Sequence, residues 1–97
     1  MKELISRAIT GHRLLRLIYN NRIRVTIEPY ALGRTAAGDE VLLAWQISPP
    51  IAQDSAWRLF QLNWIAEMRM LDDGFDATRS DRTPPLEELE LTFQSTQ

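Results

Sequence analysis

Arginine and aromatic side chains recur along the segments of this chain that have the pattern of β-strands. A guanidinium group forms forked, charge-assisted hydrogen bonds with carboxylates, phosphates and base edges, and a flat ring stacks on a base or closes an apolar pocket. These two residue types together are suited to binding an anionic ligand that carries a ring. The set comprises Tyr19, Arg22, Arg24, Tyr30, Arg34, Trp45, Trp57, Arg58, Phe60 and Trp64.

Arg58 is the most informative of these residues. It lies between the aromatic residues Trp57 and Phe60 and, in a strand, shares a face with Phe60. A solvated lysine or glutamate would carry less desolvation cost at such a position. We therefore interpret Arg58 as a residue that binds a ligand or a partner.

Residue types that catalysis requires are scarce. His12 is the only histidine and the chain has no cysteine, which excludes disulfides, thiolate metal sites and cysteine nucleophiles. The Gly-x-Ser-x-Gly elbow, the Gly-x-x-x-x-Gly-Lys phosphate loop, Gly-x-Gly-x-x-Gly and His-Glu-x-x-His are all absent from the sequence. Residues 72–76 lack the alternating acids and the closing glutamate of a calcium loop. We expect no enzymatic activity, no cofactor and no metal site, with His12 as a capping or surface residue.

Charge is distributed unevenly along the chain, although the formal net charge is only −2. Residues 1–35 carry seven cations and two acids, whereas residues 36–97 carry four cations and eleven acids. Ten of the eleven cations are arginine, the cation best suited to bidentate binding of phosphates and carboxylates. Two interpretations stay open: the halves neutralise each other in the fold, or the basic half presents a face that attracts anions.

Length and composition indicate one globular domain. The chain has 97 residues, of which 44% are apolar and 25% charged, which is enough for one modest core. The N-terminus lacks the apolar run of a signal peptide, and no segment reaches the roughly 18 consecutive apolar residues of a membrane helix. We expect a cytoplasmic protein that binds no membrane. Because a domain this small buries a limited share of its surface, association with a second copy or a partner would add stability.

The hydrophobic pattern predicts one short helix followed by short strands. Residues 2–11 have their apolar residues on one face of a predicted helix, which is expected to end at Gly11. Asn20-Asn21 is expected to form a tight turn with positive φ, and Pro29 is expected to end a strand because it has no N–H for the ladder. The predicted strands are 13–19, 22–29, 30–35, 40–48, 56–61 and 67–71, with one helical turn within 62–66.

Strands of this length and spacing predict a mainly β fold, a small barrel of about five strands with a short N-terminal helix. On segment 40–48 we expect Val41, Leu43, Trp45 and Ile47 to face the core together. Residues 1–74 form the predicted domain. Residues 75–97 form an acidic tail that is either disordered or, through 89–93, a strand that pairs with a partner.

Taken together, residues 14–75 resemble the WYL-domain family of bacterial regulators. The matching features, in order, are LIY at 17–19, IEPYAL at 27–32, WQI at 45–47, the Arg58-x-Phe60-x-Leu62 motif, and 65–71 followed by Phe75. The resemblance covers about two thirds of the chain. It implies an Sm-like or SH3-like β-barrel that binds a ligand, often a nucleotide or a nucleic-acid fragment, and relays this binding to a transcriptional or defence regulator.

Several residues depart from the family's pattern. Gln46 and Ile47 stand where the family's triplet has tyrosine and leucine, so this position can still form hydrogen bonds but has lost a stacking ring. Asn63-Trp64 stands where the family often has an arginine, and Arg24 is the nearest match to the cation before the Glu-Pro step. Residues 1–12 are too short for the winged helix-turn-helix that often accompanies the domain, so we expect the chain to act through a partner.

The sequence thus predicts a non-catalytic sensor module for an anionic ligand, either a nucleotide or a single-stranded nucleic acid. The expected macromolecular partner is a second copy of the chain or a regulator. The alternative is a protein-interaction or dimerisation module without a small ligand, in which aromatic residues and arginine form the interface. The predicted ligand-binding residues are Arg58, Gln46, Arg24, Tyr19 and Arg22.

Overall fold

Alternating apolar residues produce the strands that make up most of this protein. The computed structural model describes residues 1–50, 56–76 and 92–94, and begins with helix α1 (Lys2–Gly11). The mainly β fold with a short N-terminal helix is confirmed. The remaining elements are β1 (Arg13–Tyr19), β2 (Ile23–Arg34), β3 (Glu40–Ser48), β4 (Trp57–Gln61), the 3-10 helix η1 (Leu62–Trp64), β5 (Ile65–Gly74) and β6 (Thr92–Gln94).

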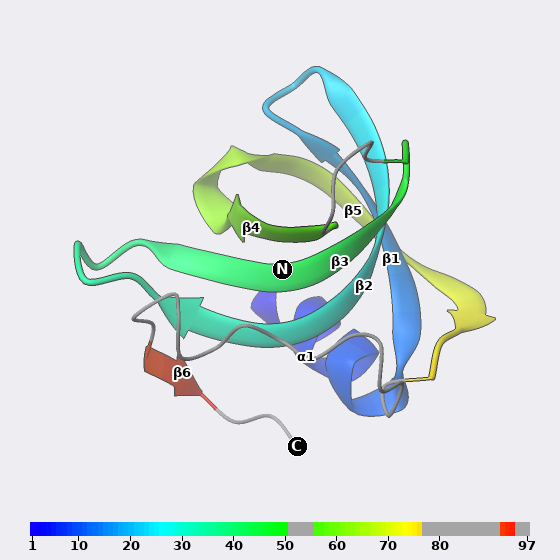
Figure 1. Cartoon of the computed structure of the whole chain (residues 1–97), viewed down its shortest axis with the longest axis horizontal. Helices are drawn as coiled ribbons and strands as arrows, with labels where there is room; N and C mark the ends of the chain where they lie inside the picture. The colour runs from blue at the N-terminus through cyan, green and yellow to red at the C-terminus, as the bar shows by residue number, and fades with distance from the viewer. Residues whose placement is uncertain (51–55, 77–91, 95–97) are drawn as a thin grey trace.

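A single antiparallel sheet curls around the core in the strand order β4-β3-β2-β1-β5 (Figure 1). Within the described ranges no ladder joins β4 to β5, so the sheet is not closed and the barrel type stays a prediction. The helical turn predicted within 62–66 is confirmed as η1, which connects these two edge strands. The strand predicted at 67–71 is longer than expected, since β5 covers 65–74.

The predicted C-terminal tail is described only in part. Residues 77–91 and 95–97, like the loop residues 51–55, lie outside the described residues. The described portion of the strand predicted at 89–93 belongs to β6, which pairs with residues 32–34 of β2 in the same chain.

A two-asparagine turn connects β1 to β2. Asn20 and Asn21 have φ values of 56° and 54°, and the Arg22 N–H donates to the Tyr19 carbonyl at 3.1 Å. Asparagine tolerates this left-handed conformation better than most residues, which suits a tight hairpin. The predicted turn is confirmed, and it aligns Tyr19 with Ile23 and Leu17 with Val25 across the two strands.

The prediction that Pro29 ends a strand is wrong, because β2 continues through it to Arg34. The ladder with β1 stops at Ile27, so Pro29 has a strand partner only on the β3 side. The register with β3 also shifts between Pro29 and Ala31, at a bulge. Proline is tolerated at edges and bulges, where no ladder bond is lost. The two predicted strands are therefore one strand, which pairs with β1 over residues 23–27 and with β3 over residues 26–34.

The concave side of the curled sheet holds the main core. Its buried members include Leu15 and Leu17 of β1, Val25 and Ile27 of β2, and Leu42, Ala44, Phe60, Leu62 and Ile65 of the later elements. On β3 the predicted core face was the wrong one, since Leu42 and Ala44, and not Val41 and Leu43, belong to the main core cluster. Val41 and Leu43 of that face are also buried, but Trp45 is half-buried and Ile47 is exposed. The pattern could not separate the faces because β3 is apolar on both.

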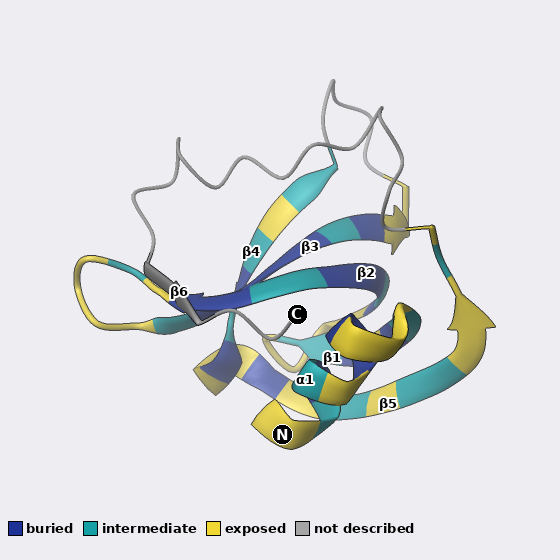
Figure 2. Ribbon diagram, turned by 90° about the horizontal axis from the view of Figure 1, so that it is seen from below, coloured by how far each residue is buried: buried dark blue, intermediate teal, exposed yellow. Residues whose placement is uncertain are grey.

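Helix α1 covers the core from the end of the sheet that β1, β2 and β5 form, with the side chains of Ile5, Ala8 and Ile9 buried in the main cluster (Figures 1 and 2). The helix ends as predicted after Gly11. His12 takes the left-handed conformation at φ 53°, where its N–H bonds back to the carbonyls of Ala8 and Ile9. The expectation of a capping role for His12 is confirmed.

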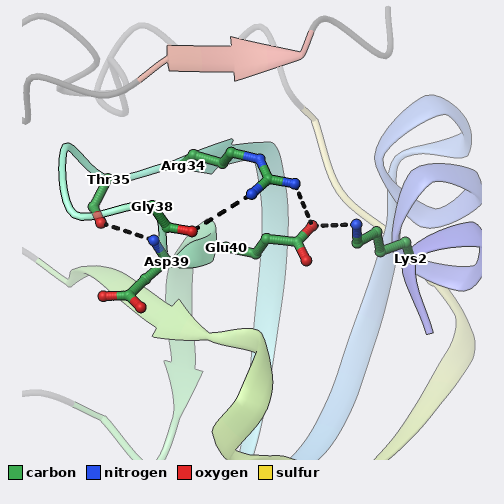
Figure 3. A network of polar contacts seen from close by, with 6 residues as sticks. All are labelled: Lys2, Arg34, Thr35, Gly38, Asp39 and Glu40. Atoms are coloured by element: carbon green, nitrogen blue, oxygen red, sulfur yellow. Dashed lines mark hydrogen bonds and ion pairs between the residues drawn. The ribbon is translucent and has the colours of Figure 1, made fainter.

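A small ionic network fastens the start of α1 to the β2–β3 hairpin (Figure 3). The Glu40 carboxylate accepts from Lys2 and lies 3.9 Å from the Arg34 guanidinium. The hydrogen bond from Lys2 and the positive charges of Lys2 and Arg34 hold the pKa of Glu40 below its usual value, against a weaker opposing effect of burial. The turn itself is closed by the Asp39 N–H, which donates to the Thr35 Oγ1 at 3.2 Å.

Ile5→Ala is expected to lower the free energy of unfolding by about 2–5 kcal/mol, because it leaves a cavity under the helix. Ile5 is fully buried in the core cluster. Ile23→Ala is the matched control: the same atoms are removed from a side chain that is 51% exposed, and the expected loss is about 1 kcal/mol or less. Urea denaturation measures both. Equal losses would show that α1 does not seal the core.

Glu40→Gln is expected to lower the urea midpoint at neutral pH and to have little effect in acid. A carboxyl whose folded pKa is depressed stabilises the fold above its unfolded pKa and loses that contribution as the pH falls through the folded value. The difference between the two proteins should therefore shrink below the ordinary glutamate pKa of about 4.3. Asp73→Asn, an exposed carboxylate outside the network, serves as the control. A pH-independent difference for Glu40→Gln would contradict the network.

Candidate functional site

The convex side of β5, β1 and β2 carries a ladder of outward-pointing charged residues. Because side chains alternate along a strand, the burial of Leu15, Leu17 and Val25 on the concave side directs the intervening residues outward. The register defines two rows across the three strands. One row contains Arg24, Ile18 and Glu67, and the next contains Thr26, Arg16 and Arg69.

A groove of about 580 Å³ lies on this convex surface. Arg16, Arg24 and Arg69 are exposed, as is Glu67, and Ile18 between them is half-buried. The groove therefore combines a positively charged rim with an apolar floor, and its volume is within the range of small-molecule sites. It is lined by Arg16, Leu17, Ile18, Arg24, Glu67, Met68 and Arg69.

The groove carries more positive charge than its own residues neutralise. Arg16 of β1 is directly opposite Arg69 of β5, and like charges at such a cross-strand position destabilise a sheet. Within the described part of the chain, none of Arg16, Arg24 and Arg69 forms a salt bridge. Of the described residues, Glu67 is the one acid that lines the groove. We call Arg16, Arg24 and Arg69 the arginine triad.

The structure divides the ligand-binding residues predicted from the sequence. Arg24 belongs to the arginine triad on the convex side. Arg22 is exposed in the β1–β2 turn. Tyr19, Gln46 and Arg58 are on the concave side or at its rim, because their strand positions align with core residues. The five residues therefore do not form one surface, and their role in binding stays a prediction.

Tyr19 and Gln46 have structural partners. The Tyr19 hydroxyl accepts a hydrogen bond from the Gln61 N–H at 3.0 Å. The Tyr19 ring contacts the Phe60 ring edge-on, with the ring centroids 5.0 Å apart. This ring also contacts Trp64, at 6.0 Å. Gln46 is buried, and its side-chain amide donates to the Pro49 carbonyl at 2.8 Å. The Tyr19 side chain thus connects β1 to the last residue of β4, and the Gln46 side chain holds the backbone that follows β3.

Arg58 is the one predicted residue that combines exposure with a place on the concave face. It is exposed on edge strand β4, opposite Ala44 and two positions from the buried Phe60. The arginine triad lies on the other face of the sheet. Arg58 is therefore an independent position against which the triad can be compared experimentally.

Arg16 and Arg69 were missed by the sequence reasoning. Each has a local signal, since Arg16 interrupts the apolar run of 14–19 and Arg69 stands between Met68 and Met70. A lone cation in a strand pattern indicates an outward position but not its neighbours. Only the pairing of β1 with β5, far apart in the sequence, places Arg16 and Arg69 directly opposite each other.

A second cluster, of aromatic rings, lies on the convex side of β2, β3 and β4. The ring centroids of Tyr30 and Trp57 are 4.7 Å apart, and those of Trp57 and Trp45 are 5.4 Å apart. The Phe75 ring forms tilted ring contacts with both Tyr30 and His12. The Tyr30 hydroxyl donates to the buried Glu28 carboxylate at 3.1 Å. These rings pack against one another and stabilise the bent half of β2.

Comparisons with known proteins identified no relative of this chain. No protein-family model, no curated protein and no solved structure matches the chain. Across residues 1–50, 56–76 and 92–94, no cluster of histidine, cysteine or acidic side chains could hold a metal ion. The same part of the chain contains no helix with the length and apolar character needed to cross a bilayer.

Arg69→Thr is expected to raise the free energy of unfolding by up to about 1 kcal/mol in dilute protein at low salt, because it removes the like-charge pair with Arg16. Arg24→Thr is the matched control, since the residue opposite Arg24 is Ile18. The difference between the variants should decrease as salt screens the repulsion. Thermal melts at two ionic strengths measure this. Destabilisation by Arg69→Thr at low salt would show that the two guanidinium groups do not repel each other.

Proposed function

We propose that this protein is a ligand-binding regulatory module whose arginine triad holds a phosphate-bearing ligand, either a nucleotide or a short single-stranded nucleic acid. The observation that carries the proposal is the direct opposition of Arg16 and Arg69, with Arg24 nearby and Glu67 as the one acid among the described residues that line the groove. A bound phosphate would reverse the unfavourable energy of this arrangement, because each guanidinium would gain a charge-assisted hydrogen-bond acceptor.

The apolar and acidic residues of the groove add to this chemistry. Ile18 lies in the row between Arg24 and Glu67, where it offers an apolar contact to a sugar or the face of a base. The Glu67 carboxylate can accept a hydrogen bond from a ribose hydroxyl or an exocyclic amino group. Phosphates bound by arginine and a base or sugar resting on Ile18 would occupy both kinds of surface. A nucleotide fits this combination better than inorganic phosphate alone.

The resemblance to WYL domains supports the regulatory part of the proposal. Arg24, the nearest match to a cation of that family's pocket, is the one sequence-predicted binding residue that lines the groove. A ligand that spans Arg24, Arg16 and Arg69 would connect β2, β1 and β5 and so stiffen the edge strand β5. A regulator that contacts β5 would then bind the loaded and free forms differently, which is the requirement for relaying a signal.

The test is calorimetric titration of the purified chain with three probes: a short oligothymidylate, ATP and inorganic phosphate. We expect binding to the oligonucleotide and ATP at low salt. With three phosphate contacts, the logarithm of the association constant should fall with the logarithm of the salt concentration with a slope of roughly −2. Absence of heat with every probe at low salt would refute the proposal.

Matched arginine variants locate the site. Arg16→Ala and Arg24→Ala should each weaken oligothymidylate binding about tenfold, the effect of losing one charge-assisted contact. Arg7→Ala, which removes the same charge from the exposed face of α1, should leave affinity nearly unchanged. Arg58→Ala tests the position predicted from the sequence. Lost affinity in Arg58→Ala with normal affinity in Arg24→Ala would move the site to the concave rim.

A further inference from the structure

Among the described strands, β5 stands at one edge of the sheet and has a neighbour on one side. β5 pairs with β1 along one edge from residue 65 to residue 74, and no strand within the described ranges pairs with the other edge (Figures 1 and 2). An unpaired edge presents a row of backbone N–H and C=O groups that a further strand can join. Natural edge strands usually avoid this by charge placement, so the charges of β5 indicate which strand it accepts.

The charges of β5 complement a second copy of β5. Glu67 and Arg69 flank Met68 and point to the convex side, whereas Met68 packs toward the core. In an antiparallel pair of identical strands centred on Met68, Glu67 of each copy stands opposite Arg69 of the other. Centring the pair on Glu67 or on Arg69 instead would place two like charges opposite each other. Directly opposite charges stabilise a sheet, and like charges destabilise it.

We infer that the β5 edge is a self-association surface, on which a second copy of this chain pairs antiparallel with its own β5 around Met68. This pairing extends the sheet across two copies through backbone hydrogen bonds. It forms two Glu67–Arg69 ion pairs, which also offset the repulsion between Arg16 and Arg69 within each copy. The interface is self-complementary, as a two-fold dimer requires.

Self-association has a consequence for the groove. The convex faces of the two copies become continuous, so that Arg16 and Arg24 of both copies lie on one surface. An oligonucleotide longer than one groove could then contact both copies. This consequence rests on the proposed function, whereas the pairing of the β5 edges does not.

Charge inversion tests the register. Sedimentation equilibrium should show that the mass of the unmodified chain rises toward that of a dimer with concentration. Glu67→Arg and Arg69→Glu should each weaken self-association roughly tenfold or more, because two favourable pairs become two like-charge pairs. The double variant E67R/R69E should restore it, since opposite charges face each other again. A monomeric unmodified chain at the highest soluble concentration would overturn the inference.

Mixing the two single variants gives the sharper result. In a mixed dimer, two arginines of the Glu67→Arg chain stand opposite two glutamates of the Arg69→Glu chain. The mixture should therefore form dimers at concentrations where each variant alone is monomeric. Circular dichroism of each variant verifies the fold. Failure of the mixture to associate, with both variants folded, would show that β5 does not pair in this register.

Cross-linking supplies a readout that does not depend on charge. The natural chain has no cysteine, so Met68→Cys introduces a single thiol at the centre of the proposed pair. Under mild oxidation it should form a disulfide-linked dimer faster than Thr26→Cys, a control on β2 in the same sheet. Equal rates would contradict the inference.

The two proposals fail in distinguishable ways. Arg24→Ala should weaken oligothymidylate binding about tenfold but leave the dimer intact, because Arg24 lies two strands away from the β5 edge. E67R/R69E should leave the dimer intact whether or not the groove binds a ligand. A chain that binds oligothymidylate but never dimerises would overturn only the self-association, and a dimer without affinity for the probes would overturn only the proposed function.

Discussion

The burial of alternate residues on the concave side of the sheet is the constraint from which the rest of the structure follows. Leu15, Leu17 and Val25 fill the core, and strand geometry then forces Arg16 and Arg24 outward. A slip of one residue in either strand would exchange the two sets and bury guanidinium groups, at a desolvation cost of several kcal/mol each. The apolar core therefore determines where the cations are, although it makes no contact with a ligand.

The bent strand β2 transmits this constraint through the whole sheet. Residues 23–27 pair with β1 and residues 26–34 pair with β3, so the two ladders overlap at 26 and 27, and the register with β3 shifts after Pro29. The aromatic cluster around Tyr30 packs on the convex side of the bend, while α1 packs on the concave side. Both faces of the bend are thus covered. The groove forms on the part of the sheet that neither covers, where β5, β1 and β2 present their polar side chains.

The convex face also shows a conflict between local stability and the arrangement of charge. A sheet optimised for stability alone would place an acid or a threonine opposite Arg16, but it has Arg69 there. Local rules are most often broken at sites that serve a function, because selection on binding offsets the loss of stability. The triad and the β5 edge share this one irregularity. Binding of an anion and pairing with a second copy both neutralise it, so the two are energetically compatible.

Much of the fold could be predicted from local patterns. The helix over 2–11, the Asn20-Asn21 turn and the turn before β5 follow from apolar spacing and backbone preferences that depend on a few neighbouring residues. The error at Pro29 arose because the effect of a proline depends on which of its sides has a strand partner. The error on β3 arose because residues 41–44 are apolar and buried on both faces, so this part of the strand does not show which face meets the main core.

The candidate site is different in kind, since it depends on pairing between distant segments. The sequence alone determined that arginines stand on strands and that the first third of the chain is basic. It indicated Arg24, but grouped it with Gln46 and Arg58, which belong to the other face. Only the tertiary structure decided that Arg16 and Arg69 are neighbours. The register of β1 against β5 is set by the packing of Leu15 and Leu17 with Met68 and Met70 inside the sheet, and a linear pattern contains no record of that packing.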